Sequence, residues 1–291
     1  MRILEQLGSP LIRRALLEAV LVGALCGAVG VHVLLRRLPF FTLALSHATF
    51  PGVVLASILG VSVYLGGAAA ALGLVLAVAA IGSTRRLEAS TATGVALAGA
   101  FALGVLLQSA QSSATRNLAG FLVGDILTVS TEDLAMTALF GLVVTAALIV
   151  FHKELVLSAF DPIGARAAGY ATTRLEVLVL ACVALTVVTS LRAVGTILSV
   201  ALLVTPALAA RQWTTDIGPV MALAAAFGAL AGVGGIAASA QWNVAGGSAI
   251  ALAATALLAV TVAVQQARTL VGRQASRHGS KSREVLPSQE P

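Results

Sequence analysis

One histidine lies where a membrane protein rarely keeps an ionisable side chain. His47 falls near mid-depth of an apolar stretch at 39–62, roughly 12 Å from its start at the helical rise per residue. Pro51, four residues later, has no N–H to donate to the His47 carbonyl, so one residue offers an imidazole and a freed carbonyl oxygen. Both groups can bind a divalent cation. We therefore predict a cation pathway here, lined also by Ser46 and Thr49. The alternative is a packed histidine beside a proline kink.

The composition requires a membrane protein around this histidine. Of 291 residues, 58% are hydrophobic and 10% charged, and the mean hydropathy is +0.99, whereas an ordinary soluble domain is about 25% charged. Apolar runs of about 20 residues can each cross a bilayer as a helix. The predicted fold class is an all-α, polytopic membrane helix bundle of about nine transmembrane helices (8–10). The expected spans are 16–35, 39–62, 64–82, 92–110, 133–151, 175–191, 194–210, 219–240 and 247–265.

The chain is expected to divide into two parts. Residues 1–265 form the transmembrane domain, and residues 266–291, which are polar and basic, form a disordered cytoplasmic tail. Most of the 18 Lys and Arg residues fall on one side of the membrane if the N-terminus is outside, so the net charge of +6 indicates topology and not a nucleic-acid partner. Cys26 and Cys182 lie inside apolar runs and are expected to be small core residues.

The other ionisable residues near the spans are expected to reach the membrane interface or to favour a helix N-terminus. Glu18, Asp133 and Glu176 each fall within three residues of a predicted span start, and His32 lies near the end of its span. A single deep histidine is a poor proton relay. The two lysines, Lys153 and Lys281, are in no phosphate-binding G-x-x-x-x-G-K-[ST] motif. The protein is therefore predicted to be a conduit that another subunit powers.

Small residues predict close helix packing in the lipid. Gly23-x-x-x-Gly27 and Gly228-x-x-x-Gly232 each place two glycines on one helix face, where backbones can approach one another.

The predicted cytoplasmic loop at 160–169 carries the signals of a short capped helix. Asp161 is suited to the N-cap, Pro162 to the first helical position and Gly169 to the left-handed position after the last turn. Such a helix is either a plain connector or a rigid knob that fits a groove on an ATPase.

Three segments resemble signature regions of one family, the membrane permease subunits of bacterial ABC importers for manganese, zinc and related divalent metals. The resemblance covers roughly residues 12–265, with the segments in order and at family-like spacing. The segments are residues 46–52 (SHATFPG), 160–169 (FDPIGARAAG), and 194–198 (VGTIL) leading to 201–211 (ALLVTPALAAR).

The resemblance implies a multi-pass permease of the bacterial plasma (inner) membrane, with a bundle similar to those of the vitamin B12 and siderophore importers. It implies an importer for Mn²⁺ or Zn²⁺, with Fe²⁺ a further option, and no permanently bound cofactor. Its partners would be membrane lipid, a second permease copy or a similar subunit, an extracytoplasmic metal-binding lipoprotein, and cytoplasmic ABC ATPase subunits that use the ATP. His47 would meet the metal. The other pathway residues would be Ser46, Thr49, Pro51, Thr205, Pro206 and Asn243, and the ATPase-coupling residues Asp161, Pro162, Arg166 and Gly169.

Two positions depart from the family pattern. Many relatives carry an aspartate four residues before the histidine, where this chain has Leu43, and an Asp-Leu-Pro-Ser-Gly segment where it has residues 243–247 (NVAGG). A missing carboxylate weakens a tight metal site. An ABC permease for a metal chelate or a small organic cargo therefore stays as an alternative. An intramembrane enzyme is a remote one, because the spans hold no H-E-x-x-H and no paired catalytic carboxylates.

Overall fold

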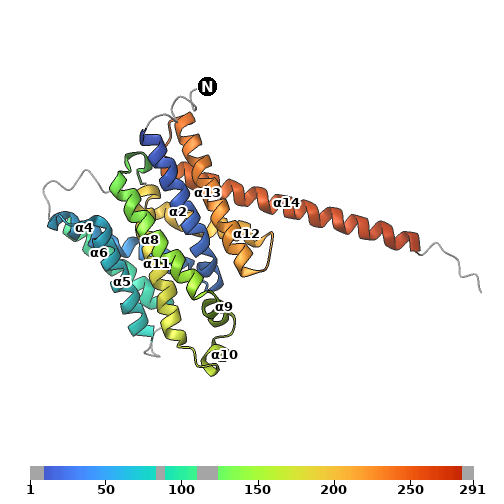
Figure 1. Cartoon of the computed structure of the whole chain (residues 1–291), viewed down its shortest axis with the longest axis horizontal. Helices are drawn as coiled ribbons and strands as arrows, with labels where there is room; N and C mark the ends of the chain where they lie inside the picture. The colour runs from blue at the N-terminus through green and yellow to red at the C-terminus, as the bar shows by residue number, and fades with distance from the viewer. Residues whose placement is uncertain (1–9, 83–88, 110–123, 284–291) are drawn as a thin grey trace, which may run out of the picture.

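The computed structural model describes residues 10–82, 89–109 and 124–283, and the regular elements in these ranges are all helical (Figure 1). In chain order they are α2 (Pro10–Leu35), α3 (Pro39–Ala48), α4 (Phe50–Leu59), α5 (Val63–Gly82), α6 (Ala89–Ser109), the 3₁₀ turn η2 (Ile126–Thr128), α8 (Thr131–Val150), α9 (His152–Phe160), α10 (Pro162–Ala167), α11 (Thr172–Val194), α12 (Thr196–Arg211), α13 (Ile217–Trp242) and α14 (Gly246–Arg283).

Each of the nine predicted spans coincides with one helix, except 39–62, which covers both α3 and α4. By length and composition, 7 helical segments of the described chain can cross a membrane, and Pro39–Leu59, which joins α3 and α4, is one of them. Thr93–Ser109 and Leu198–Arg211 are shorter apolar helices that coincide with the remaining two predictions. The all-helical polytopic bundle is therefore confirmed.

The helix α2 is the central element of the bundle. It packs against α8, α11, α12 and α13, and α4, α5 and α6 form a group on one side (Figure 1). Large apolar side chains on the outside of the bundle stay uncovered, as Leu142 of α8 does at 68% exposure. Such side chains suit a lipid environment, where the outer surface is as apolar as the interior.

The helix α14 is longer than the span that the sequence predicts. It continues through Arg283 and extends away from the bundle (Figure 1). The predicted boundary at residue 265 therefore falls inside a continuous helix. The division of the chain into a transmembrane domain and a separate disordered tail stays a prediction.

The glycine faces predicted from the sequence meet each other between α2 and α13. A Cβ atom at Gly23 would overlap the carbonyl oxygen of Gly228, and one at Gly228 would overlap the carbonyl oxygen of Gly23. Gly27 and Gly232 contact Ala224 and Ala19 in the same way. Two backbones thus touch along several turns, and the sequence prediction of close packing is confirmed.

Replacing Gly228 with valine is therefore expected to force α13 away from α2. Overpacking a tight contact costs about 1–3 kcal/mol, so the thermal midpoint of the purified protein should fall measurably. The matched control is Gly73→Val in α5, where an added Cβ meets no atom of the described chain within 4 Å. Equal midpoints for the two variants would contradict the close α2–α13 contact.

Candidate functional site

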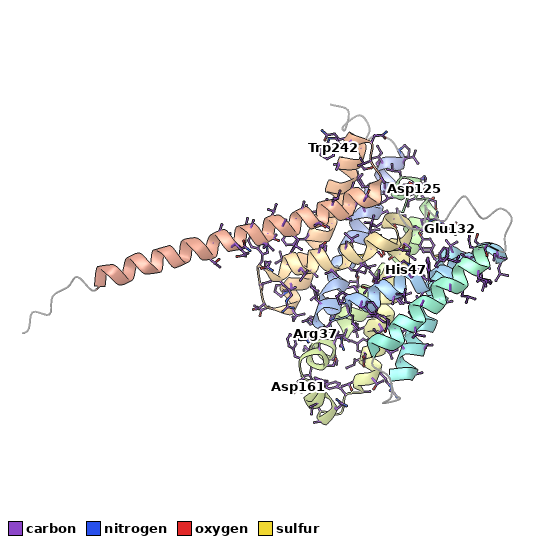
Figure 2. All side chains as sticks on the ribbon, turned by 180° about the vertical axis from the view of Figure 1, so that it is seen from behind. Arg37, His47, Asp125, Glu132, Asp161 and Trp242 are labelled. Carbon is purple, nitrogen blue, oxygen red and sulfur yellow. The ribbon has the colours of Figure 1, made fainter. Side chains whose placement is uncertain are left out.

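His47 lies in the last turn of α3, immediately before the junction with α4. Thr49 at the junction keeps helical backbone angles (φ −70°, ψ −24°), so α3 and α4 continue one another although Pro51 removes the bond to the His47 carbonyl. The imidazole is half-buried and meets Phe101 of α6 edge to face, with 5.4 Å between ring centroids. Figure 2 places His47 in the interior of the bundle, away from both ends.

Polar side chains surround this junction. Ser46 is fully buried, and its hydroxyl lies 3.3 Å from that of Ser199 on α12 while it donates to the Thr42 carbonyl. The Thr49 hydroxyl donates to the Ser46 carbonyl at 2.8 Å. The sequence predicted Ser46 and Thr49 beside the histidine, but it gave no signal for Ser199 or Phe101, because both contacts join distant parts of the chain.

The other predicted pathway residues are spread along the bundle. Thr205 and Pro206 lie on α12, where Thr205 is half-buried and its hydroxyl donates to the Ala201 carbonyl one turn earlier. Asn243 ends α13 in a left-handed conformation and follows Trp242, which Figure 2 places at one end of the molecule, well separated from His47. The structure therefore does not bring Asn243 to the histidine. Leu43 lies one turn before His47 on α3 and is half-buried.

Two carboxylates that the sequence placed at the interface are instead buried. The helix α2 begins at Pro10, so Glu18 lies two turns inside it, where it is fully buried. The Glu18 carboxylate accepts a 2.7 Å hydrogen bond from Thr137 of α8. Asp133 is 5% exposed and forms a capping box with Ser130, the N-cap residue of α8. Its carboxylate also pairs with Arg192 of α11 at 3.3 Å. These bonds join α2, α8 and α11. Asp133 lies in the first turn of α8, as predicted for an acid that favours a helix N-terminus, whereas Glu18 is not near the start of its helix.

His32 was also expected at the interface and is fully buried instead. Neither ring nitrogen has a hydrogen-bond partner in the described part of the chain. His32 lies in the last turn of α2, as expected, but α2 is central in the bundle and neighbouring helices cover this turn. Glu176, by contrast, is exposed. Both cysteines are buried, as predicted, and form no disulfide.

The short helix α10 has the predicted caps. The Asp161 carboxylate accepts a 2.8 Å bond from the Gly164 N–H, and Pro162 begins the helix. Gly169 adopts φ +88°, and the bonds from Gly169 N–H to the Arg166 carbonyl and from Tyr170 N–H to the Ala165 carbonyl close the last turn. The sequence prediction of a capped helix at this place is confirmed.

This helix is a projecting knob with an apolar tip. Ile163 of α10 is 75% exposed, and Phe160, the last residue of α9, is 64% exposed. Asp161 lies at the end of the molecule opposite Trp242 (Figure 2). Uncovered apolar side chains on a rigid, capped element outside the spans are suited to contact with another protein.

The described residues hold no group of three or more His, Cys, Asp or Glu side chains that could hold a metal ion. A half-buried imidazole among hydroxyls can contact a passing cation without retaining it, which conduction requires. The fold and this site define a multi-pass membrane transport subunit with an interior polar junction and a protruding knob.

The chain belongs to the ABC 3 transport family, whose family model matches residues 9–265. It is 35% identical over 249 residues to the manganese transport system membrane protein MntC of Halalkalibacterium halodurans, which covers 86% of this chain and 85% of that protein. It is 32% identical over 240 residues to the zinc transport system membrane protein TroC of Treponema pallidum, covering 79% and 80%. The chain is thus the membrane subunit of a bacterial transporter and not an enzyme.

Two solved structures share the architecture. The structure titled PsaBC from Streptococcus pneumoniae in complex with Fab superposes with a TM-score of 0.82 at 32% identity, over 89% of this chain and 94% of that chain. An inward-facing metal-chelate type ABC transporter gives a TM-score of 0.71 at 20% identity, over 86% and 84%. The second likeness shows the fold alone.

Proposed function

We propose that this chain is the membrane-spanning permease of an ATP-driven importer that moves a divalent metal ion, Mn²⁺ or Zn²⁺, with Fe²⁺ a further option, into the cytoplasm. The observation that carries the proposal is His47, a half-buried imidazole inside a membrane-length helix and beside buried hydroxyls. Neutral imidazole is a ligand for these ions. The manganese and zinc relatives support the cargo class.

The proposed partners follow from the two ends of the molecule. An extracytoplasmic lipoprotein would deliver the metal to the outer end, and ATPase subunits would receive α10 in a groove on the inner side. A second copy of the permease would complete the pathway. The exposed Ile163 of α10 and Phe160 at the end of α9 support the ATPase contact, because exposed apolar side chains gain from burial against a partner.

In the proposed cycle, ATP binding and hydrolysis push on α10, and the helices around His47 rock between an outward-facing and an inward-facing arrangement. The metal contacts the imidazole in passing and leaves because no ring of carboxylates among the described residues retains it. The Glu18–Thr137 and Asp133–Arg192 contacts hold α2, α8 and α11 together during this movement.

The proposal predicts that an affinity-tagged chain co-purifies from its own host with a separate ATPase that carries the Walker motifs. It also predicts that deleting the gene lowers cellular manganese or zinc, measured by mass spectrometry of whole cells, and that added metal restores growth. Normal metal content in the deletion strain, with no ATPase in the purified sample, would overturn the proposal. Loss of a chelate or an organic nutrient instead would favour the alternative cargo, with which Leu43 in place of a carboxylate is consistent.

A further inference from the structure

A basic cavity of about 430 Å³ lies beside α10, at the end of the bundle that the sequence predicts to be cytoplasmic. It opens between the turn after α2, the α9–α10 connection and the start of α11. Its polar lining includes Arg36, Arg37, Arg166, Thr172, Thr173 and Glu176. Figure 2 shows Arg37 near Asp161, at the lower end of the molecule. The role proposed for His47 does not use these side chains.

Arg36 is held in place at the cavity wall. One terminal nitrogen of its guanidinium donates to the Ser158 hydroxyl at 2.8 Å and to the Leu155 carbonyl at 3.2 Å. Its Nε is buried and has no partner in the described residues. Burial lowers the pKa of this guanidinium, and Glu176 acts in the opposite direction. A half-buried cation with an unused donor is stabilised by an anion placed against it.

Arg37 occupies a backbone position that ordinarily favours glycine. Its φ is +56°, and its N–H donates to the Leu34 carbonyl while the N–H of Leu38 donates to the Val33 carbonyl. These are the two bonds of a helix end that usually has glycine at the left-handed residue. The Cβ of an arginine is disfavoured at this angle, which points to a use for the side chain.

The start of α11 adds further donors to the cavity. Thr172 and Thr173 lie at the N-terminus of this 23-residue helix, and no side-chain hydrogen bond caps it at Ala171. A helix N-terminus carries partial positive charge, which favours an anion. The Thr172 and Arg174 N–H groups already donate to the Tyr170 and Ala171 carbonyls, so the hydroxyls are the donors that this end adds. The lining therefore combines three guanidinium groups, the hydroxyls of Ser158, Thr172 and Thr173, and a helix end, against one carboxylate on Glu176.

We propose that this cavity binds a phosphate group, supplied either by the headgroup of an anionic phospholipid or by a soluble phosphate. Arg36, Arg37 and Arg166 all line the cavity, so the bound anion ties the end of α2 to α10. Basic cavities at the cytoplasmic ends of membrane helices are suited to lipid phosphates. The site is independent of which cargo the permease carries.

The test variant is the pair Arg37→Gly and Arg166→Gln, made in the full-length permease and purified without ATPase. Glycine fits the left-handed angle at position 37, so the fold is expected to keep its stability while two cationic groups are lost. The matched control is Arg174→Gln, which removes an exposed arginine of α11 that does not line the cavity. Native mass spectrometry counts bound phosphatidylglycerol, with phosphatidylcholine as the zwitterionic comparison. Inorganic phosphate is titrated separately, and the thermal midpoint is followed against chloride at equal ionic strength.

We expect the wild type and Arg174→Gln to retain one of the two probes, and the double variant to bind it on the order of 10-fold or more weakly, at an unchanged thermal midpoint without the probe. Retention of phosphatidylglycerol assigns the phosphate to the membrane, and a midpoint shift with inorganic phosphate alone assigns it to a soluble source. Equal binding by all three proteins, or no selective binding by any, would overturn the proposal.

Discussion

Replacing His47 with alanine is expected to abolish metal uptake while the protein still inserts into the membrane and binds its ATPase. The imidazole is the metal-binding side chain of the proposed pathway. It is half-buried and packs against the ring of Phe101, so alanine removes it without leaving a buried polar group unpaired. Removal of groups that merely support a metal ligand costs 10-fold or more, so loss of the ligand itself should lower the uptake rate by at least about 10-fold.

The measurement is manganese and zinc uptake in a deletion strain that carries either the wild-type or the variant gene. His152→Ala is the matched control, because it removes another histidine, at the start of α9, outside the proposed pathway. Membrane abundance and ATPase co-purification of each variant show that the protein is assembled. Unchanged uptake by His47→Ala would support the alternative interpretation, in which His47 is a packed histidine beside a proline kink.

Replacing Gly169 with valine is expected to uncouple ATP hydrolysis from transport. Gly169 has φ +88°, and a β-branched residue is strongly disfavoured at this angle. The substitution strains the backbone by about 1–2 kcal/mol and loosens the two bonds that close α10, so the knob loses its fixed shape. The assembled transporter should hydrolyse ATP at a rate that no longer depends on delivered metal, and uptake should fall severalfold.

Gly60→Val is the matched control for this experiment. Gly60 also has a left-handed backbone (φ +68°) with open space around it, but it ends α4, far along the chain from α10. Both variants carry similar strain, and only the change beside α10 should affect coupling. If Gly169→Val kept the normal ratio of metal moved to ATP hydrolysed, α10 would be a plain connector.

The spans and the caps of α10 could be predicted because their signals are local. An unbroken apolar run predicts a membrane helix. Asp161, Pro162 and Gly169 each act on neighbouring backbone groups. The same holds for the glycine faces of α2 and α13. The glycine spacing predicts which face of each helix packs closely, but it does not predict which helix packs against it.

The burial of Glu18, Asp133 and His32 could not be predicted in the same way. Their distances from the span ends suggested the interface, but α2 begins at Pro10 and its neighbours cover it on several sides. Hydropathy identifies the segments that cross the membrane, but it does not show which helices surround each segment. For the same reason the contacts of the site with Ser199 and Phe101 required the folded chain.

The central claim, that this permease carries a free divalent metal past His47, is tested most directly by the initial uptake rates of radioactive manganese, zinc and iron. Each metal is given to the deletion strain complemented with the wild-type gene, first as the free ion and then as a preformed chelate. The account predicts rapid, ATP-dependent uptake of free manganese or zinc, which His47→Ala abolishes. Uptake of the chelate alone, or uptake of the free ion that the His47 substitution leaves unchanged, would contradict it.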